Sequence, residues 1–146
     1  MKKLSGIILV AIAFAMVLPS CGKYEEGPAL SLRSKTARLV NEWKVDQYFI
    51  AAVDVTAQYQ LQNTDLVMNI KENGEIVNTY TNNTGDPVTY SSTWEFTSDK
   101  SGIIITTAGT SRTHDILRLK NDELWLKTTY SDQALSTIHE MHLITK

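Results

Sequence analysis

The sequence predicts an all-β fold: a meander of eight antiparallel strands closed into an up-and-down barrel. Beyond residue 64, short runs alternate apolar and polar residues, as half-buried strands do. Turn-forming residues separate these runs, and Asn73-Gly74 is the strongest such signal. The runs include no long helical pattern, and a meander of this length removes its exposed edges best by closing. An open sandwich is the alternative, although the short connections do not suggest the long crossovers of a Greek key.

The first twenty residues have the pattern of a secretory signal peptide. Lys2 and Lys3 provide a positive start, and an uncharged apolar run follows at 6–18. This run is shorter than the ~18–20 residues needed to span a bilayer comfortably. Pro19 then ends the run, and Ser20 is the small residue that a signal peptidase needs. This pattern indicates a signal peptide rather than a permanent membrane anchor.

Cys21 is the only cysteine in the chain, so a disulfide framework within the chain is excluded. Its surroundings, Leu18-Pro19-Ser20-Cys21, resemble the lipobox of bacterial lipoproteins. The resemblance implies a thioether-linked diacylglycerol on Cys21, cleavage directly before this residue and acylation, for example with palmitate, of the new amino group. Two or three acyl chains hold a protein on a membrane permanently, whereas one does not. A free thiol left after ordinary signal cleavage is the alternative.

The chain is expected to have three parts: the signal peptide (1–20), a lipidated N-terminus with a flexible tether (21–33) and the barrel domain (34–146). Glycines, a proline and paired acids at 22–29 suit an exposed tether. We expect a lipid-anchored protein of the cell envelope, at the outer membrane. The acids after Cys21 are similar to signals for surface display, but a solvated tether explains them equally, so the periplasmic and surface faces both stay open.

Charge excludes one class of partner. Cleavage before Cys21 removes two of the fourteen Lys and Arg residues and none of the sixteen acids, which leaves a net charge of −4. Such a surface argues against nucleic-acid binding. The remaining length suits one domain with a sizeable core, and we expect a monomer.

The barrel domain should begin with a short helical turn over Lys35–Leu39, capped by Ser34. A strand at 40–49 follows, with Trp43, Val45 and Phe49 on its inward face.

Residues 54–61 have the composition of a helical turn or loop, with Asp54 available as a cap. The other seven predicted strands cover 65–71, 75–80, 89–97, 103–106, 113–120, 123–130 and 135–145. Their expected inward residues are Leu66, Met68, Ile70, Tyr90, Ser92, Trp94, Phe96, Leu117, Leu119, Leu124, Leu126 and Thr128.

Two stretches carry a resemblance to a known family. Residues 39–45 (LVNEWKV) look like the start of the first lipocalin strand, where a tryptophan closes the barrel floor after a helical turn. Residues 27–43 and 119–126 are similar to small lipocalin-like envelope lipoproteins of diderm bacteria. The resemblance covers the mature chain in strand order and implies floor packing by Trp43, with Arg38 as the candidate basic residue beside it. Asn41 departs from the family's glycine. Such a resemblance implies architecture far more than activity.

No stretch predicts catalysis or a cofactor. His139 and His142 are three residues apart on a predicted strand, so they point to opposite faces and do not share a metal ion. His114 likewise alternates away from Asp115. The sequence contains neither a Gly-rich phosphate loop before a helix nor a Gly-x-Ser-x-Gly elbow. We therefore expect no metal and no enzyme, while a hydrolase or metal-dependent enzyme at the barrel mouth remains a third hypothesis.

A barrel of eight strands either fills its interior with side chains or holds one small ligand. The leading hypothesis is a non-catalytic barrel that binds a small apolar or amphipathic molecule near Phe49, Tyr90 and Trp94. Expected polar neighbours on the inward faces are Gln47, Asn78, Ser92 and Thr128. Core packing explains the same aromatic residues equally well. The alternative is a filled barrel that presents its loops and the outward-facing Trp125 to an envelope protein or a polysaccharide.

Overall fold

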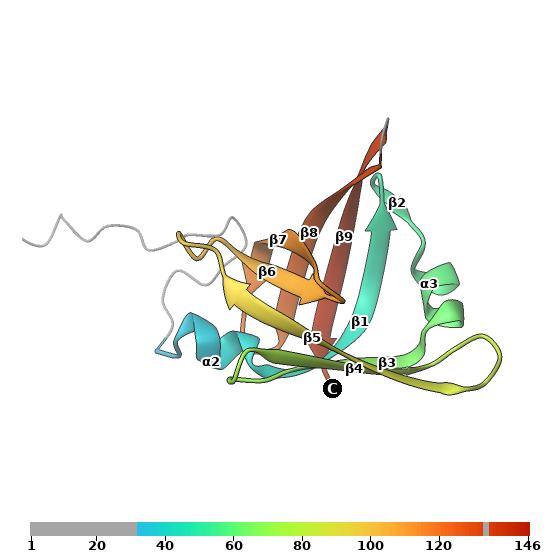
Figure 1. Cartoon of the computed structure of the whole chain (residues 1–146), viewed down its shortest axis with the longest axis horizontal. Helices are drawn as coiled ribbons and strands as arrows, with labels where there is room; N and C mark the ends of the chain where they lie inside the picture. Colours follow the sequence, from blue (N-terminus) through green and yellow to red (C-terminus); the bar gives the residue numbers. More distant parts are fainter. Residues whose placement is uncertain (1–31, 133–134) are drawn as a thin grey trace, which may run out of the picture.

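The computed structural model describes residues 32–132 and 135–146. Its strands form one antiparallel sheet in the order β2-β1-β3-β4-β5-β6-β7-β8-β9, and β1 also pairs with β9, which closes the barrel (Figure 1). This confirms the predicted up-and-down barrel. The predicted signal peptide, Cys21 and the predicted tether as far as residue 31 lie outside the described residues.

The strands are β1 (Asn41–Ile50), β2 (Val53–Asp54), β3 (Thr64–Ile70), β4 (Glu75–Thr81), β5 (Pro87–Phe96), β6 (Gly102–Thr107), β7 (Thr110–Leu119), β8 (Glu123–Asp132) and β9 (Leu135–Thr145). The helices are α2 (Lys35–Leu39) and α3 (Thr56–Gln62). Because β2 has two residues and only folds back on the end of β1, the barrel wall itself has eight strands, as predicted. The Asn73-Gly74 turn joins β3 to β4, with Gly74 at a φ of +84°.

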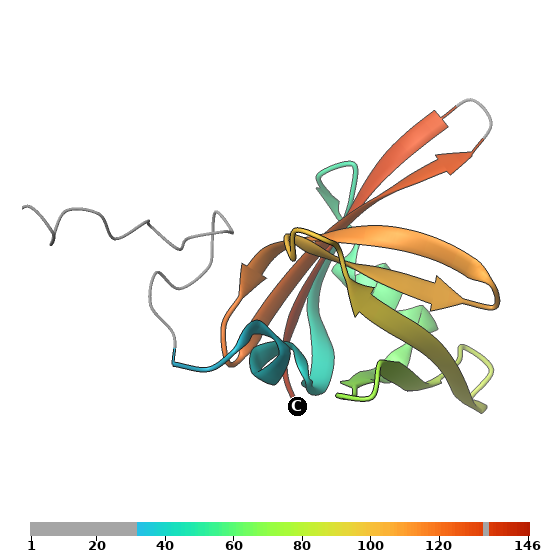
Figure 2. The ribbon, with the colours of Figure 1, turned by 60° about the vertical axis from the view of Figure 1, so that its left-hand side comes forward.

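Helix α2 lies at the end of the barrel where the chain enters β1 (Figure 2). The Ser34 hydroxyl accepts a hydrogen bond from the Ala37 N–H at 3.0 Å, which confirms the predicted cap. Trp43 is fully buried, and its indole N–H donates to the Leu39 carbonyl at 2.9 Å. Arg38 is also buried and donates from Nη1 to the Leu119 carbonyl at 2.8 Å. These contacts fix α2 to the start of β1 and to the end of β7.

The core fills the half of the barrel next to α2. Its buried residues come from every long strand and from α2, so the core is complete only when the barrel is closed. They are Leu39, Trp43, Ile70, Ile76, Trp94, Ile103, Ile116, Leu119, Leu124, Leu126 and Leu143.

A β-bulge in β1 corrects one sequence-based expectation. The pairing of β1 with β9 shifts register between Val45 and Gln47, and the extra residue reverses which side chains point inward. Tyr48 therefore lines the interior, whereas Phe49 lies on the outer face. The prediction that Phe49 shares the inward face of Trp43 and Val45 is wrong for this reason. Gln47 is exposed on the outer face as well.

A second bulge lies in β7, between Ile116 and Arg118. It places Ile116 rather than Leu117 in the core beside Leu119. The predicted inward residues of β3, β5 and β8 are otherwise on the expected faces. None of the described helices is both long enough and apolar enough to cross a membrane.

Candidate functional site

A cavity of about 260 Å³ occupies the half of the barrel away from Trp43. Inward side chains of β1 and β3 to β9, together with one residue of α3, form its wall. They are Tyr48, Tyr59, Leu66, Met68, Ile76, Asn78, Tyr90, Ser92, Ile105, Thr107, Thr110, Arg112, His114, Tyr130 and Met141. The barrel is thus packed at one end and hollow at the other, which an eight-stranded barrel allows.

The wall of this cavity changes character along the barrel axis. Leu66 and Ile76 are buried and apolar, and Met68, Ile105 and Met141 pack against the core cluster. Tyrosines and hydroxyl-bearing side chains make up most of the remaining wall. A ligand in this space would meet an apolar surface on one side and hydrogen-bonding groups on the other.

Tyrosine rings are concentrated at the hollow end. The rings of Tyr48 and Tyr59 lie 4.2 Å apart between centroids, and Tyr80 meets Tyr90 edge to face at 6.4 Å. Burial raises the pKa of Tyr48 to about 12 and also raises the pKa values of Tyr59 and Tyr90. These phenols therefore keep their protons at physiological pH and can donate hydrogen bonds.

A histidine joins this tyrosine cluster at the seam between β1 and β9. The Tyr48 hydroxyl lies 2.7 Å from Nδ1 of His139, and the ring of Tyr130 lies 4.3 Å from the His139 ring. Burial lowers the pKa of His139. His139 is therefore an uncharged member of the cluster at neutral pH.

Arg112 and His114 extend from the same face of β7. The Arg112 guanidinium lies over the Tyr130 ring, 4.6 Å from its centroid. Burial lowers the pKa of His114 to about 4, and the nearby Arg112 charge adds to this effect. His114 is neutral at physiological pH for these reasons, and Arg112 carries the positive charge of the wall. None of the described residues that line the cavity is a carboxylate.

Asn78 has an unmet hydrogen-bonding group. This residue is only 3% exposed, yet its Oδ1 is buried without a hydrogen-bond partner among the described residues. Leaving a buried polar atom unpaired costs about 1–3 kcal/mol. Nearby on the wall, the hydroxyls of Ser92 and Thr107 lie 2.7 Å apart and satisfy each other. Asn78 is thus the buried side chain of the wall with most to gain from a ligand.

Helix α3 fills a gap in the barrel wall. Strand β1 pairs with β3 only as far as Lys44, and beyond that point α3 lies between them. Gln60 donates from Nε2 to the Val45 carbonyl at 3.3 Å, across this gap. A surface cleft of about 370 Å³ lies beside α3, and Tyr59 and Leu66 line both this cleft and the cavity.

The cap predicted for this segment is displaced by one residue. Helix α3 begins at Thr56, and the N-cap position belongs to Val55, which makes no side-chain cap. Asp54 instead accepts a hydrogen bond from the Thr56 N–H at 2.9 Å, through Oδ1. Hydrogen bonding to the side chain of Thr56 and to its backbone N–H lowers the pKa of Asp54.

The three predicted binding residues, Phe49, Tyr90 and Trp94, lie in different parts of the barrel. Tyr90 lines the cavity and is 42% exposed. Trp94 belongs to the buried core, where its indole N–H donates to the Lys71 carbonyl at 2.9 Å and its ring meets Phe96 edge to face. Phe49 lies on the outer face beside His142. Of the expected polar neighbours, Asn78, Ser92 and Thr128 are buried, and Asn78 and Ser92 reach the cavity wall.

Tyr48, Tyr59 and Arg112 are among the cavity residues that were not singled out from the sequence. Tyr48 was missed because the bulge is invisible in the alternation, and Tyr59 because it lies on a segment without strand periodicity. Arg112 precedes the predicted start of its strand at residue 113 by one position. The strongest available signal was the number of tyrosines, six in the chain, of which five gather at this end.

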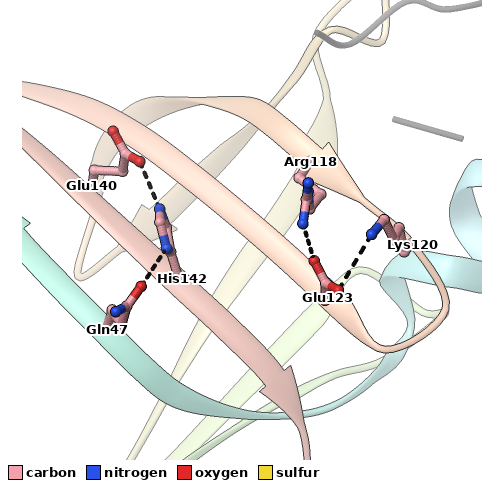
Figure 3. A network of polar contacts seen from close by, with 6 residues as sticks. All are labelled: Gln47, Arg118, Lys120, Glu123, Glu140 and His142. Carbon is pink, nitrogen blue, oxygen red and sulfur yellow. Dashed lines mark hydrogen bonds and ion pairs between the residues drawn. The ribbon is translucent and has the colours of Figure 1, made fainter. Parts of the chain in front are cut away.

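Trp125 faces outward from β8, as the alternation predicts. It stacks on His142 of β9 with centroids 3.9 Å apart and planes 7° apart, while the Arg118 guanidinium of β7 lies 4.0 Å from its ring. Polar contacts lie beside this row of three side chains, Arg118, Trp125 and His142 (Figure 3). His142 lies between Gln47 at 3.1 Å and Glu140 at 2.6 Å. The tryptophan is therefore held among its own neighbours on the barrel surface.

Glu123 lies beside the same row. It pairs with Arg118 and, at 3.3 Å, with Lys120, and these contacts lower its pKa (Figure 3). The two histidines of β9 point to opposite sides of the wall, His139 inward and His142 outward. Within 32–132 and 135–146, no three His, Cys, Asp or Glu side chains gather as metal ligands would.

No protein-family profile and no curated protein sequence matches this chain. Solved structures do match. A lipocalin-like protein from Bacteroides uniformis aligns with a TM-score of 0.53 and 12% identity over 75% of this chain and 99% of that one. Lobster apocrustacyanin A1 aligns at 0.55 and 10% identity over 79% and 63% of the two chains. Bovine odorant-binding protein aligns at 0.53 and 8% over 80% and 76%. At such identities the likeness shows the fold alone, and that fold is the lipocalin-like barrel.

Proposed function

We propose that this protein is a lipid-anchored component of the cell envelope whose lipocalin-like barrel binds a small amphipathic molecule without transforming it. The observation that carries the proposal is the cavity of about 260 Å³, which is apolar on one side and rich in hydroxyls on the other. Ligand sites in proteins are typically concave and mostly apolar, with a few polar groups that fix orientation. A barrel filled with side chains would lack this space, so the cavity favours ligand binding over the filled-barrel alternative.

The size of the cavity limits its ligand. Its volume lies slightly below the ~300–1,000 Å³ of pockets that take drug-sized molecules, so a ligand with roughly a dozen non-hydrogen atoms fits best. The fold supports the idea independently, since the bovine neighbour is an odorant-binding protein in complex with an odorant.

The wall chemistry supports binding rather than catalysis. Nucleophilic catalysis needs a hydroxyl or thiol beside a base that is oriented by a third group. The Ser92 hydroxyl contacts Thr107, and His139 contacts Tyr48, so the described residues of the wall hold no such arrangement.

A matched pair of serines tests the binding proposal. Ser91 and Ser92 are neighbours on β5, but Ser92 is buried in the cavity wall whereas Ser91 is exposed and contacts Glu75. We expect a small molecule to co-purify with the wild-type protein from its own envelope, detected by native mass spectrometry. Ser92→Leu should exclude it by filling the cavity, and Ser91→Leu should retain it. A cavity that takes up no small molecule from envelope extracts would refute the proposal.

The lipid anchor rests on the lipobox and needs its own test. Labelled palmitate should enter the wild-type protein and not the Cys21→Ala variant, when both are expressed at equal levels. The variant should also leave the membrane fraction. Equal labelling of the two proteins would refute lipidation at Cys21 and would leave the proposal for the cavity untouched.

A further inference from the structure

We infer that the ligand is a small carboxylate: an aromatic or compact apolar molecule whose anionic group meets Arg112 at the cavity mouth and whose hydrogen-bond donor reaches Asn78. This inference rests on the proposed function, because it names the chemistry of the molecule that the cavity holds. It is carried by the charge balance of the wall, by an unpaired buried amide and by the greater depth of that amide in the cavity.

The charge balance selects an anion. Arg112 contributes the one permanently charged side chain among the described residues of the wall, and it makes no ion pair with a described residue. The guanidinium lies over the ring of Tyr130, which leaves its N–H groups free to meet a carboxylate in bidentate geometry. A cation would find no carboxylate among the described wall residues.

Phenols add donors to this anion site. The hydroxyls of Tyr59, Tyr90 and Tyr130 have no hydrogen-bond partner among the described residues, and all three side chains line the cavity. Because burial keeps Tyr59 and Tyr90 protonated, they act as donors. Donors are what a carboxylate needs once it leaves water.

The unpaired amide oxygen of Asn78 indicates a hydrogen-bond donor at the end of the ligand opposite the carboxylate. Asn78 is buried, whereas Arg112 is exposed, so Asn78 lies deeper in the cavity. Its unpaired Oδ1 accepts a hydrogen bond, so an N–H or O–H on the apolar part of the ligand would satisfy it. Rings on the wall, such as Tyr48 and Tyr90, favour an aromatic body between the two polar ends.

A pair of probes isolates the charge. Indole-3-acetate has a carboxylate, an aromatic body and one ring N–H, and indole-3-acetamide differs from it only by replacing the carboxylate with a neutral amide. We expect the wild-type domain to bind the acetate at least about tenfold more tightly than the amide, measured by calorimetry and by NMR shifts of cavity residues.

Variants assign this preference to the two residues. Arg112→Gln should abolish the preference for the acetate while leaving the amide's affinity unchanged, and Arg112→Lys should retain part of it. Lys127→Gln, which removes the same charge from the outer face of β8, should change nothing. Asn78→Leu should weaken both probes, because both carry the ring N–H, and thermal unfolding would verify that each variant is folded.

The outcomes separate this inference from the proposed function. If the amide binds as tightly as the acetate, or if Arg112→Gln keeps the preference, the anion assignment is wrong and the binding function stands. If neither probe nor neutral indole shifts any cavity resonance, the inference fails, and the proposed function fails with it if the cavity also takes up no small molecule from envelope extracts. Tight binding of the acetate that shifts only outer-face resonances would also overturn the assignment.

Discussion

The hydroxyl of Tyr48 lies 2.7 Å from Nδ1 of His139, inside the barrel where β1 closes onto β9. The contact exists because the bulge after Val45 turns Tyr48 inward, and because β9 places its odd-numbered residues on the same face. One inserted residue therefore decides which aromatic side chain of β1 reaches the cavity.

Replacing Tyr48 by phenylalanine should cost about 1 kcal/mol of unfolding free energy. The change removes the hydroxyl and leaves Nδ1 of His139 without its partner, while the ring contact with Tyr59 remains. Urea denaturation at pH 7 measures the difference. Tyr90→Phe is the matched control, since its hydroxyl has no partner among the described residues, and it should change stability by less than about half as much. Equal losses would show that the bond to His139 contributes nothing.

Stability should fall as the pH drops from 7 to 5, and His114 should cause much of the fall. Its pKa is lowered from 6.5 to about 4, so the unfolded chain binds the proton more readily than the folded one. The stability is therefore full above pH 6.5 and is lost progressively as the pH falls toward 4, by at most about 2 kcal/mol at pH 5.

His114→Gln should flatten this pH dependence, measured by urea denaturation at several pH values. His142→Gln on the outer face is the control and should keep most of the slope. The carboxylates with lowered pKa values, such as Glu75 and Glu123, stabilise the fold until the pH is more acidic than this interval. They therefore do not obscure the loss of stability between pH 7 and pH 5. An unchanged slope in His114→Gln would exclude His114 as its source.

The sequence predicts the fold well because each strand carries its own signal. Period-two alternation, the Asn73-Gly74 turn and the Ser34 cap are local features, and each is present in the structure. The cavity was harder to predict because it depends on contacts between distant strands. Asn78 and Ser92 follow the alternation and were found.

Two kinds of local irregularity hid the rest of the site. The bulge in β1 exchanged the faces of Tyr48 and Phe49, and nothing in the residue pattern marks its position. Tyr59 enters the cavity from α3, whose role as part of the wall follows from the gap between β1 and β3. Hence the sequence left a hollow barrel and a filled barrel as two alternatives, and the arrangement of the assembled strands distinguishes them.

Trp43 and Trp125 should respond very differently to the same substitution. Trp43→Phe removes the indole donor to the Leu39 carbonyl and leaves a gap at a fully buried site, so it should cost about 2 kcal/mol or more. Trp125→Phe keeps a ring on the outer face, where the contacts with Arg118 and His142 are partly retained, and should cost less than about 1 kcal/mol. Urea denaturation monitored by circular dichroism measures both. Similar losses would contradict the assignment of Trp43 to the barrel floor.

Helix α3 should open locally more often than the strands around it. It has seven residues, none of them fully buried, and its N-cap residue makes no side-chain cap. A few contacts anchor it to β1: the Tyr59 ring against Tyr48, the bond from Gln60 to the Val45 carbonyl and the bond from the Tyr48 N–H to the Thr56 hydroxyl. The backbone N–H groups of Tyr59 and Asn63, which donate to the Val55 and Tyr59 carbonyls, should exchange with deuterium at least about tenfold faster than those of β8 and β9. Tyr59→Ala should speed this exchange by roughly another fivefold, because it removes a ring contact worth about 1 kcal/mol, whereas Tyr59→Phe keeps the ring and should not. If α3 is instead protected as strongly as β9, it is a rigid part of the wall, and a ligand must enter through the mouth alone.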